Sequence, residues 1–250
     1  MERRRPTDRD PDLELVHEYR VITGPQPIAH NTFELRVQKP VGFTHLPGQA
    51  MKFYINGERS KTLSIVSAPH EPELVFAYRG GRPNSDRSFK PMLQGLSEGS
   101  VVHLRDPRGE SVYPTEDGVP VVMLAGGIGI TPFISMLRHA VHIDDPRSFH
   151  LLYSNTNAED VAYGGELASL RLKRFLAKLF ITHGDSANRF NEQDIQPLLA
   201  LQPEPLFYIA GGVRFLKETT EMLVRLGVPE SRIRSTEFSG YKDDDDLRAA

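Results

Sequence analysis

The chain has 250 residues, of which 39% are hydrophobic and 25% are charged, and its formal net charge is −3. This length suits two domains of about 100–150 residues, and the charge gives no support to nucleic-acid binding. The chain has no cysteine, which excludes disulfides, thiolate zinc sites and cysteine-ligated iron–sulfur clusters, so redox chemistry would need an organic cofactor. No apolar run approaches the roughly 20 residues of a membrane helix, and we expect a cytoplasmic location.

The N-terminal half of the chain is rich in short β-forming runs. Residues 1–12 are charged and contain prolines, so we expect them to be disordered and to lack a secretion signal. Beyond them, runs of alternating apolar residues are separated by Gly and Pro, which predicts a six-stranded antiparallel β-barrel with one helical stretch near 88–93. The predicted strands are 17–22, 32–37, 50–55, 63–66, 73–78 and 100–104.

After Pro114 the pattern changes to alternating strands and helices, which predicts a doubly wound parallel α/β sheet. We therefore expect a barrel domain at 13–114, an α/β domain at 115–241 and an acidic tail at 242–250. The predicted strands are 120–125, 148–154, 178–183, 206–210 and 232–237, and the predicted helices are 131–142, 163–176, 191–200 and 213–226.

A glycine-rich turn at 125–131 is the most informative motif of the chain. It follows the apolar run 121–124 and precedes a helical pattern that begins with Pro132. A strand, a glycine turn and a helix together present backbone N–H groups and a positive helix dipole to a phosphate. This arrangement predicts a dinucleotide site, although glycine turns of this kind also occur as simple tight turns.

Six motifs in a fixed order resemble the ferredoxin–NADP reductase superfamily over roughly residues 15–241. These are the Pro-Gly-Gln turn at 47–49, the flavin-type motif at 61–69, the segments 86–90 and 106–109, the glycine turn at 126–132, the Tyr-Ile-Ala-Gly-Gly segment at 208–212 and the acidic-aromatic ending at 237–241. The resemblance implies a flavin, FAD rather than FMN, on the barrel and NADH or NADPH on the α/β half.

The residues of the flavin-type motif fit this interpretation. Because side chains alternate across a strand, Leu63 is expected to pack on the isoalloxazine while Ser64 offers a hydroxyl near N5; a strand with an ordinary buried Leu is the alternative. Ser88 either caps a helix or donates to the flavin phosphate. The residues expected to bind flavin are Lys61, Thr62, Leu63, Ser64, Arg79, Ser88 and Tyr241.

On the α/β half, Gly127 and Gly129 would let a pyrophosphate approach, and Thr131 adds a hydroxyl at the helix start. Ala210 stands where the family has Cys, and Phe238 or Tyr241 is expected to shield the flavin ring. The residues expected to bind NAD(P) are Gly127, Gly129, Ile130, Thr131, Ser154, Ala210 and Gly211, and those expected to act in hydride transfer are Ser64, Glu237 and Phe238.

The resemblance implies an oxidoreductase that passes hydride from nicotinamide to flavin N5 and then electrons to an external acceptor. The acceptor would be a ferredoxin-like or flavodoxin-like protein or an oxygenase component. A reductase for free flavins or quinones is one alternative. A flavin- or nucleotide-binding regulatory subunit with little turnover is another, which the replacement of Cys by Ala210 favours.

The segment after the second α/β strand predicts NADH. NADP-specific relatives place a Ser and then a basic residue there to pair with the 2′-phosphate. Here Ser154 is present, but no basic residue follows until Arg171, and Glu159 and Asp160 would repel a phosphate if they faced the site. A more distant arginine, Arg189 or Arg214, is the alternative source of positive charge.

Overall fold

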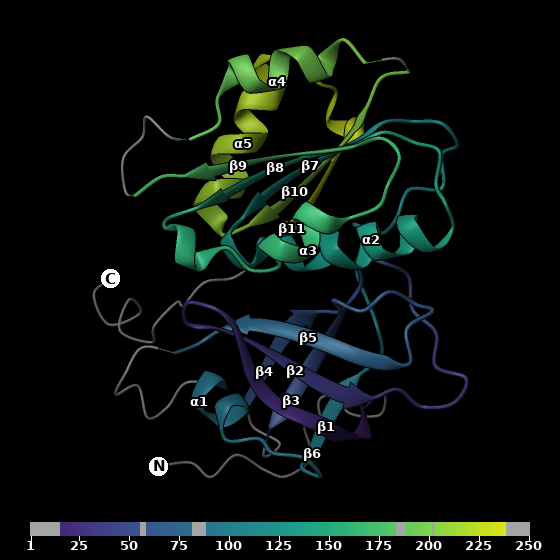
Figure 1. Cartoon of the computed structure of the whole chain (residues 1–250), viewed down its shortest axis with the longest axis vertical. Helices are drawn as coiled ribbons and strands as arrows, with labels where there is room; N and C mark the ends of the chain where they lie inside the picture. Colours follow the sequence, from purple (N-terminus) through teal and green to yellow (C-terminus); the bar gives the residue numbers. More distant parts are fainter. Residues whose placement is uncertain (1–15, 56–58, 82–88, 184–188, 202, 239–250) are drawn as a thin grey trace, which may run out of the picture.

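The computed structural model describes residues 16–55, 59–81, 89–183, 189–201 and 203–238. Two sheets lie one above the other, an antiparallel sheet below and a parallel sheet above (Figure 1). Among the described helices, none combines the length and the apolar character that a membrane crossing requires.

The lower unit is a six-stranded antiparallel sheet in the order β4-β3-β6-β1-β2-β5. Just after β4, Ile65 bridges to Phe76, and the N–H of Val66 donates to the carbonyl of Val75 at 2.7 Å, which closes the sheet into a barrel. Large apolar side chains such as Phe53 fill its interior. The elements are β1(Val16–Ala29), β2(Thr32–Gln38), β3(Ala50–Ile55), β4(Arg59–Ser64), β5(Glu73–Arg79), α1(Phe89–Gln94) and β6(Val101–Arg105).

Two strands of the barrel differ from their predicted ranges. β1 runs to Ala29 although the alternating pattern ends near residue 22, because register shifts in its pairing with β2 let one bent strand carry Gly24, Pro25 and Pro27. β4 begins at Arg59 because its polar residues pair with β3 as far as Ile55.

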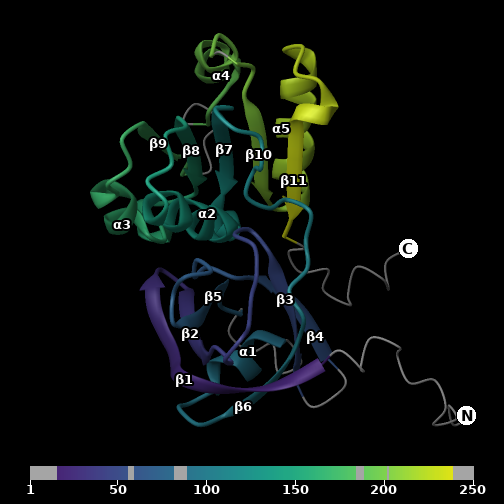
Figure 2. The same ribbon diagram turned by 90° about the vertical axis from the view of Figure 1, so that its right-hand side faces the viewer.

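The upper unit is a five-stranded parallel sheet in the order β11-β10-β7-β8-β9. The helices α2 and α3 lie on the side of the barrel, and α4 and α5 cover the other face (Figures 1 and 2). The predicted fold class is therefore confirmed. The elements are β7(Val121–Gly126), η2(Gly127–Ile130), α2(Thr131–His142), β8(Phe149–Asn155), η3(Ala158–Asp160), α3(Gly164–Ser169), β9(Phe175–Ile181), α4(Glu192–Leu199), β10(Leu206–Gly211), α5(Val213–Arg225), η5(Glu230–Arg232) and β11(Ile233–Glu237).

The predicted helix at 163–176 is wrong in its second half. α3 ends at Ser169, whose hydroxyl donates to the carbonyls of Gly165 and Glu166, and Leu170 is already extended. β9 then begins at Phe175. Because β9 is an edge strand with exposed leucines, its sequence lacks the buried pattern that identifies the inner strands.

One apolar core is shared by the two units. Val66, Val75 and Ala77 of the barrel belong to the same buried cluster as Phe133 and Met136 of α2. A second cluster, on the far side of the sheet, packs β7 and β10 against α4 and α5. The barrel is thus held against the α2 face, and a cavity opens beside this contact.

Candidate functional site

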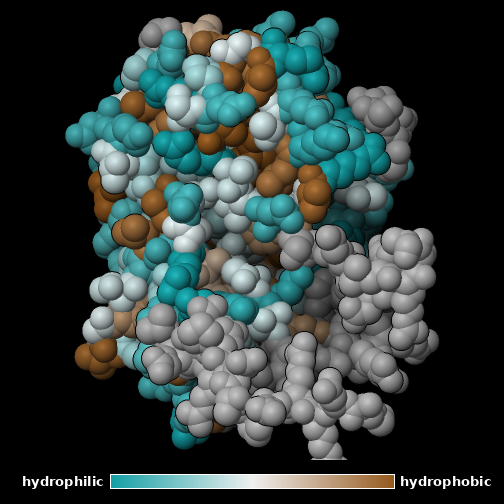
Figure 3. Space-filling model, turned by 180° about the vertical axis from the view of Figure 1, so that it is seen from behind, coloured by the Kyte–Doolittle hydropathy of each residue, from teal (hydrophilic) through white to brown (hydrophobic). Residues whose placement is uncertain are grey.

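A cavity of ≈ 1310 Å³ lies between the barrel and the parallel sheet. Figure 3 shows the hollow between the two halves from behind. It exceeds the roughly 300–1,000 Å³ of a typical small-molecule pocket. The predicted site residues that line it are Lys61, Thr62, Leu63, Ser64, Arg79, Gly127, Ser154, Glu237 and Phe238.

β4 supplies one wall from the barrel. Ser64 lies opposite Ala50 of β3 and is 3% exposed, so its hydroxyl is held in a nearly closed environment. Leu63 is 7% exposed and belongs to the barrel core, which is the ordinary role for an apolar strand residue, although it also borders the cavity. Burial lowers the pKa of the Lys61 ammonium.

The glycine turn supplies the opposite wall, but only its beginning faces the cavity. Gly127 has φ +54°, and a Cβ added there would meet no atom within 4 Å. A Cβ added at Gly129 would instead collide with the carbonyl oxygen of Ala210. The absence of a side chain at Gly129 is therefore required by the close packing of η2 on β10.

The other predicted nucleotide residues lie beneath this wall. Ile130, Thr131 and Ala210 are fully buried and do not line the cavity, and neither does Gly211. The hydroxyl of Thr131 donates to the carbonyl of Ile128 at 3.0 Å, so it closes the turn. These residues shape the turn and the strand end on which a nucleotide would rest.

The end of β11 brings the C-terminal pair to the cavity. Glu237 is exposed and lies opposite Gly211 of β10. Phe238 is half-buried against the core shared by the two units, and its N–H donates to the carbonyl of Gly211 at 2.8 Å. The predicted residues Ser88 and Tyr241 lie outside the described residues.

Asp160 does not face the cavity, contrary to the possibility that it repels a 2′-phosphate. Its side chain is 6% exposed and contacts His30 and Arg79 of the barrel. Glu159 is exposed but does not line the cavity either. The acidic pair therefore gives no direct reason for the coenzyme to be NADH.

Arginines from distant parts of the chain do reach the cavity. Arg189 and Arg214 line it, and both contact Glu218, at 3.8 and 2.6 Å. Arg225 also lines it and lies 3.5 Å from Glu192. Positive charge is thus present in the cavity, and each of these guanidinium groups already has a carboxylate beside it.

Comparison with known proteins identifies the architecture. The structure superimposes on ferredoxin–NADP⁺ reductase from Plasmodium falciparum with a TM-score of 0.77 and 14% identity, covering 90% of this chain and 97% of that one. The chain has the fold of the ferredoxin–NADP reductase superfamily. Residues 123–221 match the family model of the oxidoreductase NAD-binding domain. The resemblance inferred from the ordered motifs is confirmed.

Two curated relatives match a little over half of the chain. The chain is 29% identical to a flavohemoprotein from Bordetella pertussis over 57% of this chain and 38% of the relative. It is 27% identical to the reductase component of propane 2-monooxygenase from Rhodococcus jostii over 60% of this chain and 41% of the relative. The chain thus spans about two fifths of the length of these relatives.

The sequence analysis missed two residues that line the cavity on the side of the parallel sheet. Phe215 packs so closely over Gly126 and Gly211 that a Cβ added to either would lie within 2.9 Å of its ring. Its ring also meets Phe190 edge-on at 5.8 Å, and both aromatic residues line the cavity. The only sequence signal was the position of Phe215 just after the glycines that end β10.

Asn155 is the second missed residue. It ends β8, is 4% exposed and lines the cavity. Neither its amide nitrogen nor its amide oxygen has a hydrogen-bond partner among the described residues. Both atoms are buried, so the amide lies just beneath the surface of the cavity wall.

Proposed function

We propose that this chain is a flavin-dependent NAD(P)H oxidoreductase that binds FAD on the barrel wall and a nicotinamide dinucleotide on the sheet wall. The observation that carries the proposal is that one cavity is bordered by both β4 and the open Gly127 turn. The two ligands would therefore meet inside one space. Its volume, larger than that of a single small-molecule pocket, supports this arrangement.

The residues of the cavity fit both ligands. On the barrel wall, Lys61 and Arg79 supply cations and Thr62 a hydroxyl for an anionic group. On the sheet wall, the open backbone at Gly127 and the hydroxyls of Ser154 and Thr156 provide polar groups for a dinucleotide. A bound flavin would supply the redox chemistry, since it can take up hydride and pass on electrons singly or in pairs.

Ser64, Glu237 and Phe238 are the residues we assign to the hydride-transfer step. The buried hydroxyl of Ser64 would donate to the flavin from the barrel side. Phe238, half-buried at the end of β11, would cover the ring until nicotinamide displaces it. Glu237 is exposed at the mouth of the cavity, where it would exchange protons with solvent.

We propose that electrons leave to an external protein, either an oxygenase component or a ferredoxin-like or flavodoxin-like carrier. The chain itself has no cysteine to hold an iron–sulfur cluster. The similarity to the reductase component of a monooxygenase supports this choice. A low-turnover binding subunit is the second candidate, because Ala210 brings no thiol to the end of β10.

We propose NADH as the preferred coenzyme. Ser154 and Thr156 line the cavity at the end of β8, where no basic residue follows in the sequence before Arg171. The arginines that do reach the cavity lie beside Glu218 and Glu192, which would repel an added phosphate. The expected repulsion of a 2′-phosphate therefore comes from Glu218 and Glu192 and not from Asp160.

Anaerobic stopped-flow mixing of the FAD-loaded protein with NADH tests the function. We expect bleaching of the flavin absorbance, followed by turnover when a dye acceptor is added. Protein that takes up neither FAD nor FMN would disprove the flavin assignment. Protein that binds flavin and NADH but reduces no acceptor would favour the regulatory subunit.

A further inference from the structure

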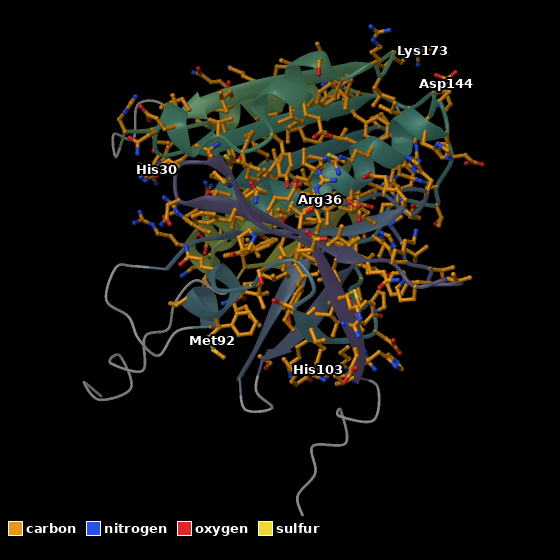
Figure 4. The ribbon with its side chains drawn as sticks, turned by 60° about the horizontal axis from the view of Figure 1, so that its bottom comes forward. His30, Arg36, Met92, His103, Asp144 and Lys173 are labelled. Atoms are coloured by element: carbon orange, nitrogen blue, oxygen red, sulfur yellow. The ribbon has the colours of Figure 1, made fainter. Side chains whose placement is uncertain are left out.

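Asp160 is a buried carboxylate at the contact between the two units. It ends η3 of the upper unit, and its side chain is only 6% exposed. Its Oδ1 atom lies 3.1 Å from Nδ1 of His30 and 3.4 Å from Nη2 of Arg79, and both of these residues belong to the barrel. Figure 4 shows His30 at the end of β1, next to the upper unit. The Asp160 carboxylate thus links the upper unit to the barrel.

The position of Asp160 is fixed by its own unit. Its Oδ2 atom accepts from the backbone N–H of Asn157 at 3.3 Å and from the side-chain amide of Asn157 at 3.2 Å. The backbone N–H of His30 donates to the carbonyl of Glu159 at 2.7 Å, which ties the same turn to the barrel. Burial alone would raise the pKa of Asp160, but the hydrogen bond from His30 and the charge of Arg79 outweigh it and lower the pKa. The group is therefore ionised in neutral solution.

The side chain of Arg79 borders the cavity and also contacts Asp160. Arg79 ends β5, lines the cavity and is 46% exposed, while one nitrogen of its guanidinium points at Asp160. A guanidinium carries five N–H donors in a rigid fork, so contact with one carboxylate oxygen leaves donors for another anion. On the barrel wall that anion would be the phosphate of the flavin.

We propose that Asp160 is a positioning residue for flavin binding and that it acts through Arg79. This inference rests on the proposed function. A free arginine side chain has many rotamers to lose when it binds, and the buried carboxylate reduces that loss by holding the guanidinium at the cavity edge. The nucleotide-binding unit thereby contributes to holding the flavin without touching it.

The test is the dissociation constant of FAD, measured by quenching of flavin fluorescence, for wild-type protein and Asp160→Ala. We expect the variant to bind FAD about fivefold more weakly, because Arg79 loses its orienting partner. In an Arg79→Gln background, which itself weakens binding, the same Asp160→Ala change should have no further effect. This double-mutant comparison separates action through Arg79 from a general loosening of the fold.

Asn157→Ala is the matched control. It removes the side-chain amide of the η3 capping pair but keeps the carboxylate that faces Arg79 and the backbone N–H of residue 157 that donates to Oδ2 of Asp160. We expect a lower thermal midpoint but an FAD affinity within twofold of wild type, which is about 0.4 kcal/mol. Asp160→Asn, which keeps the shape of the side chain, should weaken FAD binding in the same direction if Asp160→Ala does not fold.

Three results would overturn the inference. These are FAD binding unchanged or tighter in Asp160→Asn, a loss in Asn157→Ala as large as that in Asp160→Ala, and a full Asp160 effect that persists without Arg79. Tighter binding would mean that the carboxylate competes with the phosphate. Failure of the wild-type protein to bind FAD would instead disprove the proposed function, so the two failures are distinguishable.

Discussion

On the barrel side of the cavity, Lys61, Ser64 and Arg79 present side chains, whereas on the sheet side Gly126 and Gly127 present backbone. Side chains on paired strands can be exchanged without moving the strand, so the barrel wall can be changed one residue at a time. The backbone wall is held by packing behind it, where Gly129 lies against β10 and Phe215 lies over Gly126. A substitution in the backbone wall therefore affects both folding and ligand binding, unless the added side chain extends into the open cavity.

The largest expected effect comes from Gly129→Val, which tests the packing behind the glycine wall. The added side chain would collide with the backbone of Ala210, so we expect the free energy of unfolding to fall by about 3 kcal/mol or more. Urea denaturation followed by circular dichroism measures this. A variant with wild-type stability that had lost only its reduction by NADH would show that Gly129 faces the nucleotide.

Gly127→Ala tests the open part of the same turn. A Cβ at Gly127 meets no protein atom, and the positive φ costs only about 1–2 kcal/mol for a non-glycine residue. We expect the fold and the bound flavin to persist while the dissociation constant for NADH rises about tenfold, as loss of a close backbone contact of about 1.4 kcal/mol would produce. Reduction by dithionite serves as the control. Unchanged NADH affinity would assign the turn a purely structural role.

Ser64→Ala tests the side-chain wall. Removing one hydroxyl donor should slow flavin reduction by NADH about fivefold, because one hydrogen bond contributes about 1 kcal/mol. Nucleotide affinity should stay near normal, since Ser64 belongs to the barrel. The rate at saturating NADH and its half-saturation concentration, both from stopped flow, separate these effects. A change confined to the half-saturation concentration would contradict the assignment.

Thr156→Arg tests whether positive charge at the end of β8 selects the coenzyme. We expect the ratio of kcat/KM values to move towards NADPH by roughly 1–3 kcal/mol, the effect of one charge-assisted contact. Lys173→Arg is a control, because Lys173 pairs with Asp144 at the outer edge of the upper unit (Figure 4). A wild-type preference of about tenfold or more for NADPH would show that the 2′ site is elsewhere.

The smallest effect concerns pH and the contact between the units. Burial is the main cause that lowers the pKa of His45, His70 and His139, and neighbouring positive groups lower it further. A histidine whose folded pKa is depressed stabilises the fold above its unfolded pKa, near 6.5. This stabilisation is lost as the pH falls below that value.

We therefore expect the unfolding free energy to decrease modestly from pH 7 to pH 5, and His139→Gln to reduce the slope. His103→Gln is the control, because His103 lies on β6 at the far end of the barrel (Figure 4). A wild-type stability independent of pH in this range would contradict the expectation. An equal change of slope in the control would assign the effect to histidines in general.

The sequence predicted what depends on local pattern. Apolar runs and glycines located most strands, the α2 and α5 helices, and the cavity residues of β4. It did not predict what depends on contacts between distant segments. The burial of Gly129 against Ala210, the partners of Asp160 and the position of Arg225 at the cavity all require the folded chain. Phe215 was missed because an aromatic residue in a first helical turn usually indicates only a core position.

The apolar core shared by the two units has a consequence for recombination between homologues. Val66, Val75 and Ala77 of the barrel pack in the same cluster as Phe133 of α2, and Ser135 donates to the carbonyl of Ser67 across that contact at 2.8 Å. A chimaera joined near residues 110–118 would inherit two halves of one core from different parents. Such a chimaera should fold well only when the loop after β4, strand β5 and helix α2 come from the same parent. These three segments would therefore have to be exchanged together.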